Sequence, residues 1–295
     1  DKKGNTINNS IIWCDSRATK IGDNIFSEIG HEKSMSHLLN SPGNFTLSKL
    51  IWIKKNKPEI YQKIDKVLLP GDYLSYKLSG EINTTITGLS EGIFWDFKKN
   101  DIAYWLLEDL DISKTIIPSI VKNFSCQSHV SKEASIETEL PSGIHINYKA
   151  GDQPNNAFTL GVTEQGQVAT TAGTSGVIYA LTNNLKSNEP IRLNNFAHVN
   201  YSSSKIIGKL LCLNGCGIQY NFLRKSFNFE SYEMMNKVAE NIKPGSEGLK
   251  LFPFGNGAER MFYNKNLSSK YFDLNLNKHT SAHFARATLE GIVYS

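Results

Sequence analysis

Strand-like and helical patterns alternate between residues 143 and 182, and this alternation most limits the folds open to the chain. GIHINYK reads as a strand that delivers Asp152 at its carboxyl end, and NNAFTLGV reads as a short helix. QVATTAGTSGVIYAL predicts two strands joined by a Gly-Thr-Ser-Gly turn. Similar alternation runs through the rest of the chain, with helical spacing at 47–53, 101–112 and 281–295. Alternating strands and helices predict an α/β fold, and 295 residues favour two domains.

The turn between those two predicted strands has the composition of an anion site. Thr170, Thr171, Thr174 and Ser175 supply hydroxyls, and Gly173 lets the backbone approach a ligand closely. Consecutive backbone N–H groups in a tight turn can bind phosphate. The turn contains no lysine and matches neither G-x-x-x-x-G-K-[ST] nor G-x-G-x-x-G. An ordinary glycine-rich hairpin turn is therefore an equally good interpretation.

Asp152 is the candidate proton acceptor. A carboxylate at the end of a strand, beside Gly151 and before Pro154, lies where a crevice opens in α/β folds. Phosphoryl transfer needs a positioned nucleophile, charge neutralisation and a group that takes the proton. The alternative is structural, because an aspartate at this position can cap a helix that starts near Asn155.

Charge and hydropathy exclude several classes of protein. The net charge is +4 and the basic runs, such as those at 54–55 and 98–99, are no longer than two residues, so no nucleic-acid partner is expected. No apolar stretch approaches the roughly 18 residues that a membrane helix needs. The polar beginning, DKKGNTINNS, lacks the apolar region of a signal peptide.

The cysteines predict no metal site. Cys14 and Cys126 are isolated, while Cys212 and Cys216 form a C-x₃-C spacing without a second pair. We interpret them as buried free thiols in a reducing cytoplasm.

Two further charged or metal-binding motifs are weak. His279 and His283 are spaced to share a helix face, but HTSAH lacks the glutamate of H-E-x-x-H. The pair Glu259-Arg260 either orders its glycine-rich loop or is simply solvated.

Seven stretches, in order along nearly the whole chain, resemble the FGGY carbohydrate kinases. They are IIWCDSRA, the segment from VLLPGDYLSYKLSG to WDF, AGDQPNNAFTLGV, TTAGTSGVIYA, NNFAHVN, LFPFGNGAERM and HFARATLEGIVYS. The resemblance implies the two-domain, ribonuclease H-like fold of actin, hexokinase and Hsp70. It makes residues 1–161 the remainder of an N-terminal sugar-binding domain. Residues 162–295 become the first part of a C-terminal nucleotide-binding domain.

The same resemblance implies roles for individual residues. Asp152 would be the catalytic base that takes the proton from a sugar hydroxyl, and Gln153 would contact sugar hydroxyls. Nucleotide contacts would come from Gly173, Thr174, Ser175, Gly215 and Gln219. Mg²⁺ would arrive with ATP, held largely by the phosphates and by waters, without protein metal ligands.

The sequence lacks two parts that the resemblance implies. The family begins with a strand that carries D-x-G-T, the first phosphate loop, and continues past EGIVYS to an adenine-side loop. We therefore interpret these 295 residues as an internal piece of a longer kinase, and we expect this piece alone not to transfer phosphate.

The expected reaction is ATP-dependent phosphorylation of D-xylulose to D-xylulose 5-phosphate. GDQPNNA and NNFAHVN favour that substrate. A family member acting on ribulose, glycerol or gluconate is the alternative. A second alternative is a non-catalytic sugar- or nucleotide-binding relative, although Asp152 argues against it. A third alternative is an actin-like assembly protein. The resemblance is compatible with a cytoplasmic homodimer.

Overall fold

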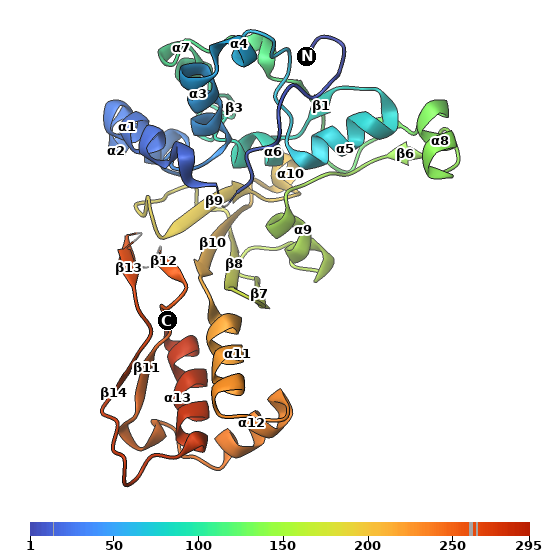
Figure 1. The fold of residues 1–295 in the computed structure, drawn as a ribbon. Helices are drawn as coiled ribbons and strands as arrows, with labels where there is room; N and C mark the ends of the chain where they lie inside the picture. The colour runs from blue at the N-terminus through green and yellow to red at the C-terminus, as the bar shows by residue number, and fades with distance from the viewer. Residues whose placement is uncertain (14, 260–261, 264) are drawn as a thin grey trace. The chain divides into compact units, whose positions relative to one another are not determined.

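The computed structural model describes residues 1–13, 15–259, 262–263 and 265–295 (Figure 1). The chain divides into two compact units. Unit 1 consists of residues 1–169, 179–190 and 194–209, and unit 2 of residues 170–178, 191–193 and 210–295. The division cuts four strands, so it does not follow a single point in the sequence. The family-based boundary between residues 161 and 162 stays a prediction.

Short helices make up most of unit 1. Their bounds are η1 Ser16–Ala18, α1 Thr19–Ile29, α2 His31–His37, α3 Thr46–Asn56, α4 Pro58–Tyr61, α5 Pro70–Ser79, α6 Ile86–Glu91, α7 Tyr104–Asp109, η2 Lys114–Ile116, α8 Lys132–Thr138, α9 Asp152–Thr159 and α10 Tyr201–Ser204. Local sequence explains several ends. Prolines occupy the first positions of α4 and α5, where no backbone donor is needed. Gly80 ends α5 in the left-handed conformation, as predicted.

The strands of unit 1 form small sheets. β1 (Asn83–Thr84) pairs in parallel with β4 (Ser119–Ile120). Two antiparallel pairs follow, β2 (Trp95–Asp96) with β3 (Asp101–Ile102) and β5 (Ser128–His129) with β6 (His145–Ile146). The largest sheet, whose strands are the four cut by the division into units, has the order β7-β8-β10-β9, with bounds Val168–Ala172, Gly176–Thr182, Ile207–Leu213 and Leu193–Ala197. The two strands predicted around the Gly-Thr-Ser-Gly turn are thus β7 and β8.

Unit 2 packs three helices with short strands. Its elements are α11 (Cys216–Ser226), α12 (Tyr232–Glu240), η3 (Ser246–Gly248), β11 (Lys250–Phe252), β12 (Gly257–Glu259), β13 (Lys265–Leu267), β14 (Lys270–Phe272) and α13 (Ser281–Tyr294). β11 pairs antiparallel with β14, and β12 with β13. Helix α13 contacts α11, α12 and β11, and α11 and α13 lie side by side in Figure 1.

Each unit has its own apolar core. In unit 1, Leu47, Leu50 and Ile51 of α3 are buried with Leu106 and Leu107 of α7. Trp95 and Phe97 belong to the same core, as expected. In unit 2, Leu223 of α11, Met235 of α12 and Ala285 of α13 are buried together. Burial of these apolar faces is the main driving force that holds short helices in place.

Two secondary-structure predictions are wrong. Residues 11–13 form no strand, and Trp13 is 85% exposed. Without an apolar environment, a short run such as Ile11–Ile12–Trp13 gains nothing from strand formation. Residues 86–91 form helix α6 instead of strand or turn, since the side chain of Thr85 caps it by accepting from Gly88 N.

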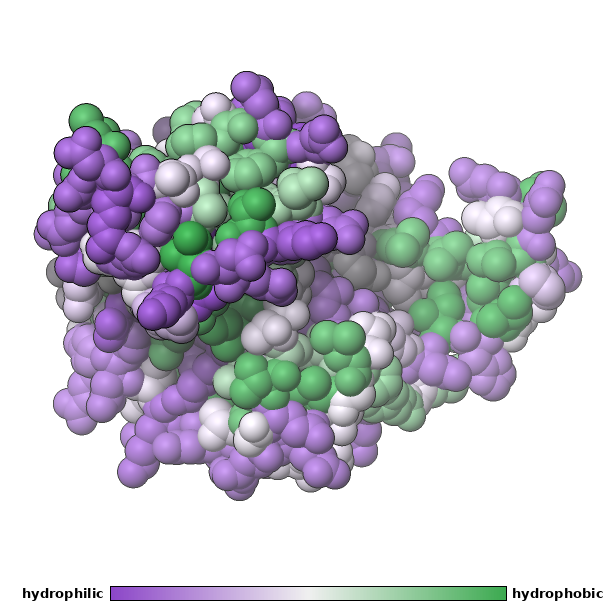
Figure 2. Space-filling model, turned by 90° about the horizontal axis from the view of Figure 1, so that it is seen from below, coloured by the Kyte–Doolittle hydropathy of each residue, from purple (hydrophilic) through white to green (hydrophobic). Residues whose placement is uncertain are grey.

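Apolar side chains also reach the surface. Figure 2 shows apolar residues gathered among hydrophilic ones on the face seen from below. Ile136 and Leu276 are 85% and 86% exposed. Within the ranges described above, no helix combines the length and the apolar character that crossing a membrane requires.

Candidate functional site

Asp152 is the first residue of α9, not the end of a strand. β6 ends at Ile146, and Gly151 is the N-cap of the helix without any side-chain capping bond. The capping interpretation is therefore wrong as well. Asp152 Oδ1 accepts from Gln153 N at 2.7 Å, and Oδ2 accepts from Gln153 Nε2 at 3.2 Å. The carboxylate is exposed, and a negative charge in the first turn is favoured by the helix dipole.

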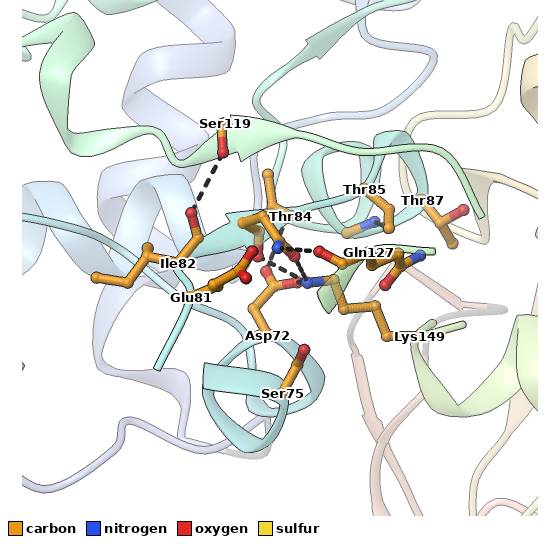
Figure 3. A network of polar contacts seen from close by, with 12 residues as sticks. Asp72, Ser75, Glu81, Ile82, Thr84, Thr85, Thr87, Ser119, Gln127 and Lys149 are labelled. Atoms are coloured by element: carbon orange, nitrogen blue, oxygen red, sulfur yellow. Dashed lines mark hydrogen bonds and ion pairs between the residues drawn. The ribbon is translucent and has the colours of Figure 1, made fainter. Parts of the chain in front are cut away.

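A buried ion pair fixes the segment that leads into Asp152. Lys149 Nζ lies 3.5 Å from Asp72 Oδ1 and donates to the carbonyl of Asn83 at 2.8 Å and to its side-chain oxygen. Thr84 Oγ1 donates to Asp72 Oδ2 at 2.8 Å. Figure 3 shows Lys149 pointing toward Asp72 within this network. Helix α5, strand β1 and the approach to α9 are thus tied at one point.

Burial has the largest effect on the pKa values of this pair. It raises the pKa of Asp72 and lowers the pKa of Lys149, although each charge favours the other. The ion pair is therefore weak evidence for stability by itself, while loss of one partner would leave a buried charge uncompensated. Its main consequence is positional, because the contacts of Lys149 hold the segment before α9 against α5 and β1.

Glu91, at the end of α6, lies directly behind Gly151. A Cβ on residue 151 would be 2.0 Å from Glu91 Oε1, so the Glu91 carboxyl would have to move to admit a side chain there. The residue is half-buried, but Oε1 is inaccessible, and no donor bonds to it among the residues that the model describes. Burial first, and then the charges of Asp152 and Asp72, raise the pKa of Glu91 to about 8.

Three more polar side chains accompany Glu91 in unit 1: the buried Tyr179 and His198, and the half-buried Tyr148. Burial, with a smaller contribution from Glu91, raises the pKa of Tyr148 to about 12 and that of Tyr179 well above its usual value. Tyr179 Oη lies 3.4 Å from His198 Nδ1. Burial lowers the pKa of His198 to about 4, so this histidine is neutral at pH 7. Tyr148 Oη also donates to Asn155 Oδ1 at 3.1 Å, which links the group to α9.

The predicted phosphate turn packs against the beginning of α11 in unit 2. Gly217 N donates to the carbonyl of Thr174 at 3.1 Å. A Cβ on residue 217 would lie 2.2 Å from Gly173 O, so glycine is required for this contact. Gly173 and Thr174 are exposed and Ser175 is half-buried. An exposed hydroxyl-rich turn beside a helix N-terminus suits an anion, because the helix dipole adds positive potential there.

Gly215 and Gln219 belong to the same helix end. Gly215 is the N-cap of α11 in the left-handed conformation, with no side-chain capping bond. Gln219 is buried, and its backbone N–H donates to Gly215 O at 2.8 Å. Gln219 therefore faces the interior, where its side chain hydrogen-bonds Tyr271.

Glu259 orders the glycine-rich segment of unit 2. The residue is fully buried, and its Oε2 accepts from Asn214 N at 3.4 Å, directly before the N-cap of α11. Burial raises the pKa of the Glu259 carboxyl. The predicted partner Arg260 lies outside the described residues.

The candidate residues fall into two groups. Asp152 and Gln153 lie in unit 1, whereas the turn residues, Gly215 and Gln219 lie together in unit 2. Sequence patterns missed Glu91, Tyr148, Lys149, Tyr179 and His198. Their only sign in the sequence is that they are charged or polar aromatic residues within apolar or glycine-rich stretches. This sign does not indicate which residues they contact.

The cysteine predictions need correction. Cys216 is buried as expected, but Cys212 is only half-buried and Cys126 is exposed, and Cys14 lies outside the described residues. Cys126 is not isolated either, since His129 and His145 lie close to it. His283 forms a capping box with Thr280, and His279 Nδ1 accepts from Asn275 N, so both have structural roles.

Comparison with known proteins identifies the family to which the chain belongs. Residues 1–159 match the N-terminal domain of the FGGY family of carbohydrate kinases, which is more than half of the chain. The chain belongs to the FGGY family. The resemblance seen in the sequence is therefore confirmed.

Relatives with known names support the same family and fold. A xylulose kinase from Staphylococcus xylosus is 25% identical to this FGGY chain, over all of the chain and 61% of that relative. The solved xylulose kinase from Rhodospirillum rubrum matches with a TM-score of 0.82 and 25% identity, over 94% of the chain and 56% of that protein. Plasmodium falciparum glycerol kinase, solved with ADP, matches with a TM-score of 0.86 and 18% identity, over 99% of the chain and 58% of that protein.

These matches confirm the predicted actin-like kinase fold. They also show that the FGGY chain spans less than two thirds of the length of each of these relatives.

The carboxyl of Glu91 should make stability depend on pH. Its pKa is about 8 when folded and about 4.3 in an unfolded chain, so only the folded state holds the proton between these values. The free energy of unfolding should fall as pH rises through this window, by up to about 1.4 kcal/mol per pH unit. Glu91→Gln should remove this slope and be more stable than the parent near pH 8.

Urea unfolding from pH 4.5 to pH 8.5 measures this effect, with the exposed Glu28→Gln on α1 as the matched control. An equal slope in the parent and the Glu91→Gln variant would mean that Glu91 is ionised in the folded chain at neutral pH.

Proposed function

We propose that this chain is part of an ATP-dependent sugar kinase whose substrate is D-xylulose and whose catalytic base is Asp152. One observation carries the proposal. In a chain of the FGGY family, an exposed carboxylate begins α9, and a buried ion pair anchors the backbone three residues before it. Xylulose kinases among the relatives support the choice of sugar.

Asp152 is suited to take a proton from a sugar hydroxyl. Both of its oxygens accept hydrogen bonds from Gln153, which orients the carboxylate. Among the described residues, no lysine or arginine pairs with it, so its charge is not already neutralised. As the hydroxyl attacks the γ-phosphorus, the O–P bond forms, the bond to ADP breaks, and the hydroxyl proton passes to Asp152. Gln153 would contact neighbouring sugar hydroxyls.

The turn at 173–175 would hold the ATP phosphates. Thr174 and Ser175 carry hydroxyl donors, and Gly173 allows close approach of the backbone. Contact with the first turn of α11, through Gly217, adds the potential of the helix N-terminus. When bound, Mg²⁺ would enter with ATP, coordinated largely by phosphates and waters, and would neutralise phosphate charge.

Glycerol is a second candidate acceptor. The glycerol kinase of Plasmodium falciparum matches the fold as closely as the xylulose kinases do. Similarity of fold does not discriminate between the two acceptors, because both sugar and glycerol carry a reacting hydroxyl and differ in the rest of their structure. A substrate screen is therefore part of the test.

Asp152→Asn should abolish most phosphate transfer. The screen measures ADP release by the protein that carries this sequence at its full natural length, with D-xylulose, L-xylulose, D-ribulose, glycerol and gluconate. We expect D-xylulose to be the best substrate and kcat to fall by about 10²–10⁴-fold in the variant. The exposed Asp23→Asn on α1 is the matched control and should keep parental activity.

Other results would change the proposal in defined ways. A better rate with another acceptor would keep the kinase and reject D-xylulose. Parental kcat in Asp152→Asn would reject Asp152 as the base. ATP binding without transfer to any acceptor would favour a non-catalytic relative.

Gly217→Ala should weaken nucleotide binding selectively. The added methyl group would lie 2.2 Å from Gly173 O and must push the turn away from α11. We expect KM for ATP to rise by at least about tenfold, which corresponds to about 1.4 kcal/mol, with little change in KM for the sugar. Gly71→Ala, whose methyl group would have its nearest neighbour at 3.6 Å, is the control. An unchanged KM for ATP would argue against the turn as a phosphate site.

A further inference from the structure

A cluster of side chains that could hold a metal lies at the antiparallel pair of β5 and β6, separate from the residues assigned above. Cys126, His129 and His145 each offer one ligand atom, and these atoms all lie within 4.8 Å of one another. Cys126 Sγ is 3.5 Å from His129 Nε2, and the imidazole rings of His129 and His145 are 4.6 Å apart. We call these three residues the Cys–His cluster.

The pairing of β5 with β6 brings the cluster together. His129 and His145 are directly paired across the antiparallel strands, a position that leaves side chains about 4.5–5.5 Å apart. Backbone bonds from Gln127 N to Ile146 O and from Val130 N to Ile144 O hold the register on both sides. Cys126 precedes β5 by two residues and turns its thiol toward His129. The ligands are therefore preorganised by backbone pairing and not by a shared helix face.

We propose that the Cys–His cluster binds one Zn²⁺ ion through the Cys126 thiolate and one nitrogen of each imidazole. Zn²⁺ is four-coordinate with Zn–S near 2.3 Å and Zn–N near 2.0–2.1 Å, which separates neighbouring ligand atoms by about 3.3–3.6 Å. The 3.5 Å contact already has this length, and the remaining separations need only small side-chain rotations. Binding releases the thiol proton, and a water completes the tetrahedron.

The ligand set selects the class of metal. One thiolate and two imidazoles suit a borderline-soft ion, whereas Mg²⁺ and Ca²⁺ require oxygen ligands. A simple thiol–imidazole hydrogen bond would account for the Cys126–His129 contact alone. It gives no role to His145, the third ligand on the facing strand. All three residues are exposed, so an ion can reach them without opening the fold.

A bound metal would also restrain the backbone segment that leads to α9. β6 leads within three residues of its end to Lys149, the anchor of the segment before Asp152. A metal that joins residue 126 to both strands therefore restrains this segment from its other end.

Cobalt binding tests the proposal directly. The untagged, reduced chain is stripped with a chelator and titrated with Co²⁺, which gives a thiolate-to-cobalt charge-transfer band when a cysteine is a ligand. We expect saturation at one Co²⁺ per chain, displacement of the band by Zn²⁺, and one retained Zn²⁺ after gel filtration. Cys126→Ser should lose the charge-transfer band, and His129→Ala and His145→Ala should each weaken binding by at least about tenfold.

Matched variants separate this site from other ligands. Cys212→Ser and His279→Ala remove a cysteine and a histidine outside the cluster and should bind like the parent. Circular dichroism of each variant checks that the chain is folded. Absence of the band in the parent, its persistence in Cys126→Ser, or parental affinity in His145→Ala would each overturn the proposal.

Discussion

The buried pair of Lys149 with Asp72 is the interaction on which the candidate site depends. It joins α5, β1 and the segment before α9, and these elements share no long strand or helix that could align them otherwise. Because burial opposes both charges, the pair persists only with its full set of hydrogen bonds. Asp152 follows three residues later, so the geometry of this network sets where the carboxylate begins its helix.

Glycines allow close contacts in both groups of candidate residues. Gly151, just before Asp152, leaves space for the carboxyl of Glu91, and Gly217 lets the 173–175 turn touch α11. In each case a missing side chain allows a polar group to approach the backbone. Under the proposed function, Asp152 would accept a proton and the 173–175 turn would offer hydroxyls at a helix N-terminus. Phosphoryl transfer from ATP to an alcohol needs both.

The sequence predicted some of these features and missed others for physical reasons. Helical spacing predicted α3, α7 and α13, because apolar faces at that period must be buried. Motif order predicted the family and the fold, which depend on many residues together. The beginning of α9 at Asp152 was missed, since the cap there is backbone alone. Lys149–Asp72, Glu91–Gly151 and the Cys–His cluster were also missed. They join residues 77, 60 and 19 positions apart, and periodicity carries no information at such separations.

Hydrogen exchange would test most directly whether the sugar binds at the beginning of α9 and the nucleotide at the 173–175 turn, as proposed. The protein at its full natural length would be compared free, with D-xylulose alone and with ADP alone. The account predicts that the sugar slows exchange of amides around 149–156, and that ADP slows exchange around 173–176 and 215–219. Sugar protection confined to the 173–176 turn, or ADP protection confined to the beginning of α9, would contradict it.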